Sequence, residues 1–386
     1  MQDGFSKEIT DYINNLIEKS SLEEWLDGLK AKGVPGIDTT LDFVTHLRQL
    51  SALQQYLAKE LTPSEQDELA NIRAPISKLA RVVQDQVGAS RFLSTETQKV
   101  LDKVIWGLNS VNLFSNIAKS NADPLGKLYN TLEKAYQQQV RINGTDSARG
   151  NAVAGIIEAL VTMIPDTVDL ILSPIIMDSN YKMATNTYRF FPVAILDTLR
   201  SDIAVKQGLT YHVAAHEIYH AVFFAERDLP HDKEMLRRQR CYIQHVERVE
   251  KAFIKEEEAV AHSGDLTYGE DAPDFEGLQA SYMMLKEYGK LEEKPYHDLN
   301  MTRQQLFFYT YAATQCRDDQ FRRTPPNQAD PHSLGYVRIN APTSLLTSFH
   351  EAFKCPASSR MRQLYLAANH DECNLIGQVA RLRRPK

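Results

Sequence analysis

The stretch Ala215-His216-Glu217-Ile218-Tyr219-His220-Ala221 decides the fold, because it contains the pattern His-Glu-x-x-His. Apolar residues recur with helical spacing around it, which predicts a helix from Tyr211 to Glu226. Residues four apart lie on one face of a helix, so His216 and His220 can bind the same metal ion. Glu217, the next residue after the first histidine, then reaches a water at that metal. This arrangement is typical of a hydrolytic zinc site.

A catalytic zinc usually has three protein ligands, so a third ligand is expected elsewhere in the chain. Two groups of carboxylates follow: three consecutive glutamates at 256–258, and Gly-Glu-Asp-Ala-Pro-Asp at 269–274. The second group is favoured, because Glu270 and Asp274 lie four apart on one helical face. One of them can bind the metal while the other accepts the second N–H of a ligand histidine. The glutamates at 256–258 remain an alternative, and His212 has the four-residue spacing but no glutamate after it.

Length and composition indicate an ordinary globular chain. With 386 residues, 43% hydrophobic and 24% charged, the chain has room for one large domain or two. The net charge of −6 does not favour phosphate backbones, so no nucleic acid is expected as a partner. The most apolar stretches, 152–176 and 190–196, contain charged residues or proline, so no membrane span of about 20 residues is expected. Residues 1–8 lack the basic and apolar regions of a signal peptide.

The pattern of apolar residues and turns predicts a mainly α (α+β) fold with a small mixed sheet. Residues 1–165 are expected to form a helical N-terminal region, and residues 166–386 the domain that carries the chemistry. Three helix starts are predicted from hydroxyl residues followed three positions later by Glu or Gln, at Ser21, Thr62 and Thr95. The expected strands are Val168–Ile176 and Thr187–Leu196, and the expected later helices are Lys233–Ala261 and Tyr268–Tyr288.

Three segments, in order along the chain, resemble the neprilysin and endothelin-converting-enzyme family of zinc metallopeptidases. They are 215–221, quoted above, 268–282 (Tyr-Gly-Glu-Asp-Ala-Pro-Asp-Phe-Glu-Gly-Leu-Gln-Ala-Ser-Tyr) and 330–340 (Asp-Pro-His-Ser-Leu-Gly-Tyr-Val-Arg-Ile-Asn). In the family, the second and third of these segments have the patterns G-E-N-I-A-D-x-G-G-L and D-x-H-S-x-x-x-x-R. Phe191–Leu196 and Ala352–Met361 are similar to two further family segments, and the likeness runs from about residue 170 to 375.

The resemblance implies a thermolysin-like catalytic domain with one zinc ion per chain and a role for each matching residue. The implied zinc ligands are His216, His220 and Glu270. Glu217 is the implied general base, Asp274 orients His216, His332 binds the oxyanion and Arg338 binds a substrate carbonyl. Residues 1–165 are then a reduced form of the helical lobe that covers the site in this family.

The sequence departs from the family at three places. The family's Asn-Ala-Tyr-Tyr segment, which holds the substrate main chain, corresponds to Asp178-Ser179-Asn180-Tyr181, where either Asp178 or Asn180 is the match. Pro273 stands where the family has alanine, and Glu276 replaces the first of two glycines.

The resemblance also gives positions to the four cysteines. Cys241 and Cys373 match two family cysteines that pair with each other, so a disulfide is expected between them. Cys316 and Cys355 match cysteines whose partners are not found in this sequence, and they are expected to bridge each other or to stay free. By the same resemblance, the protein is expected to be extracellular or secreted.

These observations predict a zinc-dependent metalloendopeptidase. It would act on peptide substrates, on the amino side of large apolar residues, and its oligomeric state is not predicted. The alternative is a catalytically impaired neprilysin-like protein that acts as a peptide-binding or structural module.

Overall fold

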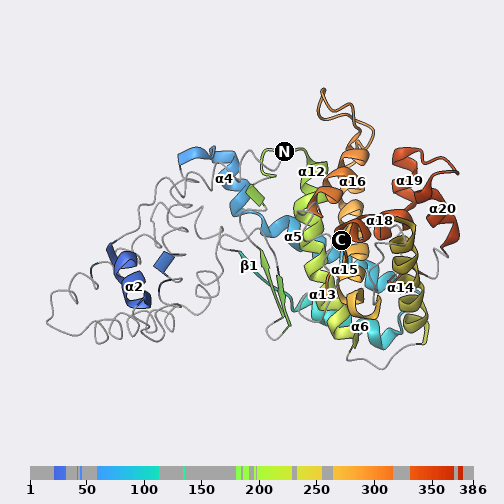
Figure 1. Ribbon diagram of the computed structural model, residues 1–386, viewed down its shortest axis with the longest axis horizontal. Coiled ribbons are helices and arrows are strands. Elements are labelled where there is room, and N and C mark those ends of the chain that lie inside the picture. Colours follow the sequence, from blue (N-terminus) through green and yellow to red (C-terminus); the bar gives the residue numbers. More distant parts are fainter. Residues whose placement is uncertain are drawn as a thin grey trace. The chain divides into compact units, whose positions relative to one another are not determined.

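The computed structural model describes the chain in several stretches, and these are mainly helical, which confirms the predicted fold class (Figure 1). The described residues are 21–31, 41, 44–45, 59–112, 134, 180–183, 186–190, 195–196, 198–227, 233–253, 264–315, 331–368 and 373–376. Their helices are α2 (Ser21–Ala31), α4 (Pro63–Ala70), α5 (Arg73–Ala89), α6 (Thr95–Trp106), α12 (Ile203–Lys206), the π-helix η2 (Gln207–Tyr211), α13 (His212–Arg227), α14 (Lys233–Phe253), α15 (Gly264–Tyr288), α16 (Arg303–Thr314), α18 (Gly335–Leu345), α19 (Thr347–Phe353) and α20 (Arg360–Ala367).

The chain divides into two compact units. Unit 1 comprises Met1–Ile72, Asn112–Asp178 and Phe191–Leu199, and unit 2 comprises Arg73–Val111, Ser179–Phe190 and Arg200–Lys386. The predicted boundary at residue 165 lies outside the described residues and stays a prediction. The structure adds that α5 and α6 cluster with the later part of the chain.

Of the three predicted helix starts, the one at Ser21 coincides with the first residue of α2, and the other two have different outcomes. In unit 1, Thr62 caps α4 as predicted, since its side chain accepts from the N–H of Glu65 and the Glu65 side chain accepts from the N–H of Thr62. In unit 2 the cap of α6 is Ser94, which accepts from the N–H of Thr97 at 3.1 Å, so the prediction of Thr95 was wrong by one residue. Gln98 is not free to complete a capping box there, because its amide donates to the carbonyl of Ser90.

Unit 2 contains a three-stranded sheet in the order β1-β3-β2, with β1 at Asn109–Asn112, β2 at Asn180–Lys182 and β3 at Thr187–Phe190. β2 and β3 are antiparallel, and Tyr181 pairs with Tyr188. The turn between them uses Asn186 at positive φ, and its side-chain amide donates to the carbonyl of Val104 in α6 at 2.9 Å. The predicted strand Thr187–Leu196 is therefore shorter than expected, because Ile195 and Leu196 are helical. The strand predicted at Val168–Ile176 lies outside the described residues.

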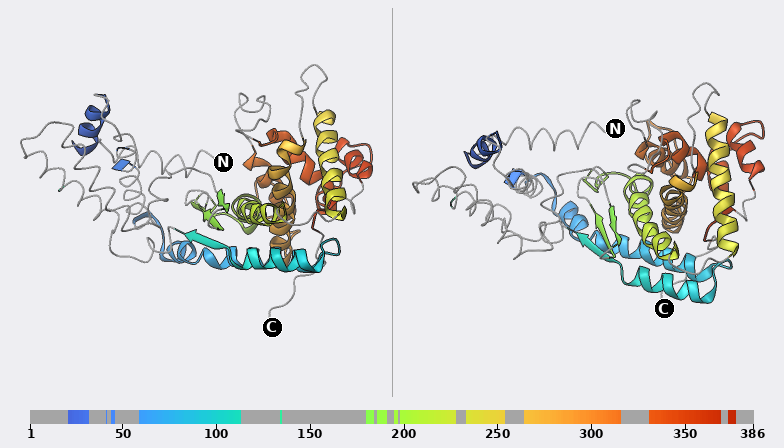
Figure 2. Two further views of the ribbon diagram at one scale, coloured as in Figure 1. Left: turned by 90° about the horizontal axis from the view of Figure 1, so that it is seen from below. Right: turned by 60° about the horizontal axis from the view of Figure 1, so that its bottom comes forward.

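The core of unit 2 forms around α13. This helix packs against α15 on one side and against α5 and α6 on another, which Figure 2 shows with α5 and α6 in blue to cyan. The residues that meet there are fully buried, for example Ile218, Leu278 and Val83. Tyr219 of α13 also donates a hydrogen bond to the Gln86 side chain of α5 at 2.7 Å. The segment before residue 112 thus contributes directly to the packing of the helix that carries His-Glu-x-x-His.

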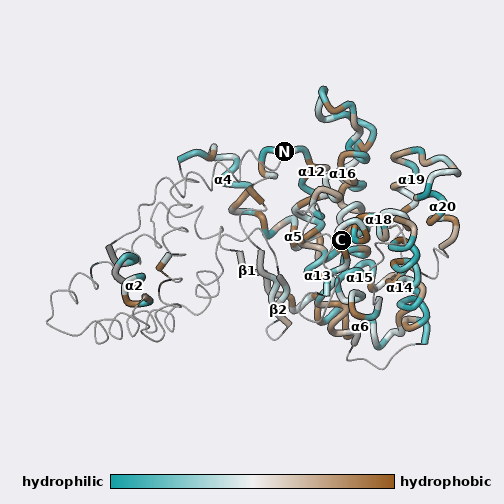
Figure 3. The backbone as a smooth tube through the Cα atoms, in the orientation of Figure 1, coloured by the Kyte–Doolittle hydropathy of each residue, from teal (hydrophilic) through white to brown (hydrophobic). Residues whose placement is uncertain are grey.

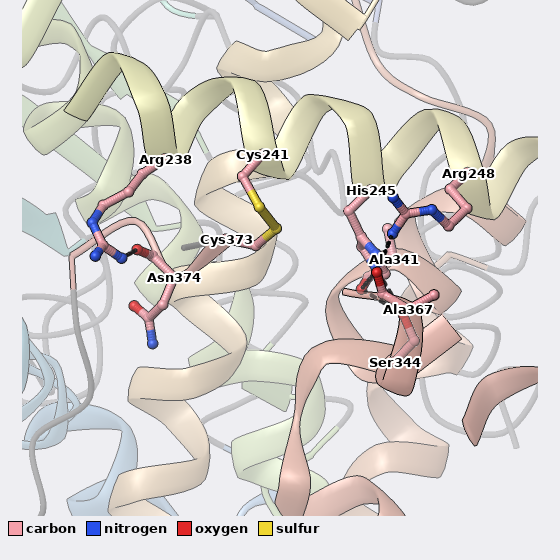
Figure 4. The surroundings of a disulfide bond; sticks show 9 residues. All are labelled: Arg238, Cys241, His245, Arg248, Ala341, Ser344, Ala367, Cys373 and Asn374. Carbon is pink, nitrogen blue, oxygen red and sulfur yellow. Dashed lines mark hydrogen bonds between the residues drawn. A yellow bond between two sulfur atoms is a disulfide. The ribbon is translucent and has the colours of Figure 1, made fainter. Parts of the chain in front are cut away.

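Helix α14 joins the C-terminal part of the chain to this core. Hydrophilic and hydrophobic residues alternate along it (Figure 3), and its buried face includes Tyr242 and Val246. Cys241 forms the predicted disulfide with Cys373, and Arg238 next to it donates to the carbonyl of Asn374 at 2.7 Å (Figure 4). Cys355 is free, whereas Cys316 lies outside the described residues. No helix in the described stretches is both long and apolar enough to cross a membrane.

Candidate metal centre

The helix that carries the two histidines begins with an unusual turn. The π-helix η2 runs directly into α13, and Gly208 within it lies against α16. A Cβ at Gly208 would be 2.4 Å from the carbonyl oxygen of Phe307 and 2.2 Å from the hydroxyl of Thr310. Only glycine permits so close an approach. The contact fixes where α13 starts and therefore where its histidines lie, and π-turns often occur at functional sites.

The three residues of the motif form one buried cluster. His216, Glu217 and His220 each offer a ligand atom, and these atoms lie within 4.8 Å of one another. The His216 and His220 rings meet edge to face with centroids 4.6 Å apart, and the His220 ring stacks on Phe224 at 5.6 Å. The helical spacing therefore brings the two imidazoles together as the sequence predicted.

Helix α15 brings Glu270 to the same point. Its Oε2 lies 3.3 Å from Nε2 of His216 and 3.4 Å from Nε2 of His220. Four ligands at about 2.1 Å from a tetrahedral zinc are roughly 3.4 Å apart, so these separations have the size expected for one ligand set. The close packing is possible because Gly277 faces α13, where a Cβ would lie 2.9 Å from the backbone nitrogen of His216.

The donor atoms fit a zinc ion. Oε2 of Glu270 is buried and receives no hydrogen bond of good geometry, although three imidazoles surround it. Burial alone would raise the pKa of Glu270, but the imidazoles of His216, His220 and His332 outweigh it and lower the pKa. An ionised carboxylate next to two imidazole nitrogens is a donor set that zinc prefers.

Asp274, one turn after Glu270, contacts the first histidine. Its Oδ1 lies 2.8 Å from Nδ1 of His216, which leaves Nε2 directed at the cluster. The same carboxylate accepts two hydrogen bonds from the guanidinium of Arg338, from Nε and Nη2. Burial raises the pKa of Asp274, but Arg338 and His216 outweigh burial and lower it. Burial also lowers the pKa of His216, and Asp274 reverses this and raises it to about 10.

The third segment of the resemblance also reaches the cluster. Nε2 of His332 lies 3.2 Å from Oε2 of Glu270, and its side chain is 35% exposed, more than those of His216 and His220. Arg338, six residues later in α18, is buried. His332 thus lies beside the cluster and is partly open to solvent. Arg338 is buried and contacts Asp274.

Two groups of predicted residues are not placed. Asp178 and the glutamates at 256–258 lie outside the described residues, so the alternative third ligand is not tested. Asn180 begins β2, at the edge of the sheet, but its side chain is not among those that the structure describes. Which of Asp178 and Asn180 holds a substrate stays a prediction.

The two substituted positions on α15 lie deep in the helix. Pro273 is inside α15 and buried, where its missing N–H removes one bond of the helix ladder. Glu276 is fully buried, and its Oε1 accepts from the backbone N–H groups of Leu375 and Ile376, each at 3.1 Å. The replacement of glycine by glutamate therefore binds the C-terminal segment to the ligand helix.

His212 is a buried neighbour of the site that the sequence gave no role. Its ring meets Tyr311 edge to face at 4.5 Å, and its Nε2 lies 3.4 Å from the carbonyl oxygen of Asp274. Burial lowers the pKa of His212 to about 3, so the imidazole is neutral. The spacing of four residues to His216 was the available signal.

Comparison with known proteins agrees with these observations. Residues 179–365 match the family model described as Peptidase family M13. The chain is 24% identical over 302 residues to an endothelin-converting enzyme homolog of Locusta migratoria, covering 71% of this chain and 39% of that protein. It is 34% identical over 108 residues to Neprilysin-1 of Caenorhabditis elegans, covering 26% of this chain and 14% of that protein.

Among solved structures, the fold is similar to that of the zinc metalloprotease Zmp1 of Mycobacterium tuberculosis in its open state. The TM-score is 0.54 at 14% identity, covering 84% of this chain and 51% of the other. The chain spans 39% of the Locusta migratoria relative, so the match concerns part of that protein's length. Residues 179–365 are therefore similar to peptidase family M13, and the relatives that match the chain include an endothelin-converting enzyme homolog and a neprilysin.

Proposed function

We propose that this protein is a zinc-dependent metalloendopeptidase that hydrolyses peptide bonds. The observation that carries the proposal is the convergence of His216, His220 and Glu270, in which Oε2 of Glu270 lies as far from each histidine Nε2 as two ligands of one tetrahedral zinc would lie apart. The match of residues 179–365 to peptidase family M13 supports the same reaction. The disulfide between Cys241 and Cys373 supports an extracellular or secreted location, where disulfides persist.

Three side chains of this protein have distinct tasks in the reaction. Zinc, when bound, would polarise the scissile carbonyl and make water more acidic. Glu217 takes a proton from the attacking water on its carboxylate and delivers it to the departing amine. Nε2 of His332 donates a hydrogen bond to the oxygen that becomes negative, while Asp274 holds Nδ1 of His216.

The substrate main chain is proposed to bind beside β2, the edge strand of the sheet. The anchoring side chain is Asn180 or Asp178. Arg338 uses Nε and Nη2 to hold Asp274, so Nη1 is the nitrogen that remains for a substrate carbonyl. Cleavage on the amino side of large apolar residues is proposed from the family resemblance.

The test combines metal analysis with one isosteric variant. Purified protein is expected to contain about one zinc per chain and to cleave members of a peptide library. Glu217→Gln is expected to retain the zinc and to lose turnover, because an amide cannot accept the proton. Glu351→Gln, at an exposed glutamate of α19, is the matched control and should retain turnover. Zinc-loaded wild-type protein that cleaves no peptide would instead favour a peptide-binding or structural module.

A further inference from the structure

The residue proposed to bind the oxyanion lies in a segment without regular structure. Residues 331–334 form neither helix nor strand, and α18 begins only after them, without a side-chain cap. The carbonyl of Leu334 accepts the N–H groups of Val337 and Arg338, which joins the segment to the first turn of α18. Besides the approach of its own Nε2 to Glu270, the position of His332 can be fixed by side-chain contacts that its neighbours make.

One such contact joins the neighbour of His332 to the neighbour of Glu270. The hydroxyl of Ser333 donates to Oδ2 of Asp271 at 2.8 Å, and both side chains are buried. Asp271 is itself held in place, since its carboxylate also bonds Thr267, one turn earlier in α15. A second bond, from the hydroxyl of Tyr242 to the carbonyl of Asp271 at 2.9 Å, fixes the backbone there.

The Ser333–Asp271 hydrogen bond joins the residues next to His332 and Glu270, the two side chains that the reaction requires to be aligned. Ser333 follows His332, and Asp271 follows Glu270, so the hydrogen bond ties their backbones one residue away from each side chain. The Arg338–Asp274 pair ties the same two segments farther along, within α18. It holds the helix, whereas the Ser333 contact lies next to the irregular residues that carry the imidazole.

We propose that Asp271 and Ser333 are positioning residues that hold His332 against the Glu270 end of the site. The inference deepens the proposed peptidase function and rests on it, because the contact matters for turnover only if His332 assists the reaction. Neither side chain needs to touch substrate. Loss of the bond leaves the zinc ligands in place and lets the His332 imidazole move.

The first test is Ser333→Ala, compared with Ser281→Ala as the matched control. Ser281 is a fully buried serine of α15 whose hydroxyl donates to Leu278 within the same helix. Ser333→Ala is expected to lower kcat by 10- to 100-fold, as small misplacements of reacting groups do, with zinc affinity and KM within about threefold of wild type. Ser281→Ala is expected to leave kcat within about threefold. Equal kcat in wild type and Ser333→Ala would overturn the proposal.

Substitution of Asp271, the partner of Ser333, gives an independent test. Asp271→Asn keeps an acceptor oxygen for the Ser333 hydroxyl and is expected to retain kcat within about threefold, while Asp271→Ala should match Ser333→Ala. The double variant with alanine at both positions should be no slower than Asp271→Ala, because the Ser333–Asp271 contact is already lost in each single variant. A multiplicative loss in the double variant would contradict the proposed pairing.

Hydrogen exchange separates this inference from the proposed function. Backbone amides of residues 332–337 are expected to exchange faster in Ser333→Ala than in wild type, while those of α13 stay unchanged. If wild-type protein cleaves no peptide, the proposed function fails, yet faster exchange would still establish the anchoring contact. Unchanged exchange in Ser333→Ala would overturn the anchoring itself.

Discussion

Asp274 is the residue on which the electrostatics of the site depend. It is fully buried and contacts both His216 and the guanidinium of Arg338. Arg338 is also buried, so its charge is compensated by this one carboxylate at short range. Removing one partner of a buried pair is costly, because the other charge is left in a medium of low polarity.

Asp274→Asn is therefore expected to act on metal binding and on stability together. The amide is neutral, so it holds the Nδ1–H of His216 less strongly than the carboxylate does and does not compensate the charge of Arg338. Zinc affinity should fall by about 10- to 100-fold and the free energy of unfolding by about 3–5 kcal/mol. Competition with a coloured chelator measures the first change and denaturant unfolding the second.

Asp202→Asn provides the matched control for that variant. Asp202 pairs with Arg303 through two oxygens in a partly buried site on α12 and α16. This variant should lose stability and leave zinc affinity unchanged. Equal zinc affinities for Asp274→Asn and wild type would contradict the role given to Asp274.

Four-residue spacing predicted that His216 lies beside His220 and that Glu270 lies beside Asp274. The family resemblance predicted that these two pairs form one site together with His332. His216, His220, Glu270 and Asp274 are all placed by four-residue spacings within two helices, which is a local property. Asp271 had no such signal, because its role depends on a segment 62 positions away. Contacts of this kind arise from packing and are not visible in one sequence.

The geometry of the cluster depends on how closely α13 approaches α15. Gly277→Ala is expected to separate the two helices, because the new Cβ would lie 2.9 Å from the nitrogen of His216 and 3.2 Å from its Cα. These are backbone atoms, which cannot move away from the new Cβ as the end of a flexible side chain could. Overpacking of this kind should cost about 1–3 kcal/mol of stability and weaken zinc binding.

Gly269→Ala, on the same helix, is the control for helix propensity. No atom lies within 4 Å of a Cβ built there, so alanine fits without a clash. It should leave stability unchanged or raise it by up to about 1 kcal/mol, with zinc affinity retained. A loss of zinc affinity in Gly269→Ala equal to that in Gly277→Ala would show that helix separation is not the cause.

The helices were predictable from their apolar spacing, and their interruptions were not. The helix predicted from Tyr211 to Glu226 is α13, yet it begins after a π-turn that depends on the contact of Gly208 with α16. Likewise, α15 continues through Pro273, which local rules treat as a kink or a helix end. Burial of α15 on several sides offsets the missing backbone bond.

Glu276 links α15, the helix that carries Glu270, to the last described residues of the chain. It accepts N–H groups of Leu375 and Ile376, next to the disulfide at Cys373. Burial raises the pKa of Glu276 to about 8, although those two N–H groups and Arg238 act in the opposite direction. The protonated form is therefore favoured in the folded protein more than in the unfolded chain.

This pKa predicts a pH-dependent part of the stability. The contribution is full below the ordinary pKa of 4.5, declines as the pH rises, and is lost above about 8. Glu276→Gln removes the titration while keeping an acceptor oxygen for the two N–H groups. The free energy of unfolding of this variant should thus rise relative to wild type between about pH 5 and pH 8.

Chelator present in both samples keeps zinc from contributing to that comparison. Glu351→Gln, at an exposed position, should follow the wild-type curve at every pH. Parallel curves for wild type and Glu276→Gln would contradict the raised pKa. The sequence had marked Glu276 only as a departure from the family, because its partners lie about 100 residues later.

We infer that His216, His220 and Glu270 hold one zinc ion. A crystal structure of the zinc-loaded protein, with anomalous scattering at the zinc edge, tests it most directly. One anomalous peak is expected, within about 2.2 Å of Nε2 of both histidines and of a carboxylate oxygen of Glu270. A peak at another set of ligands, or no peak at this cluster in protein that contains zinc, would contradict the claim.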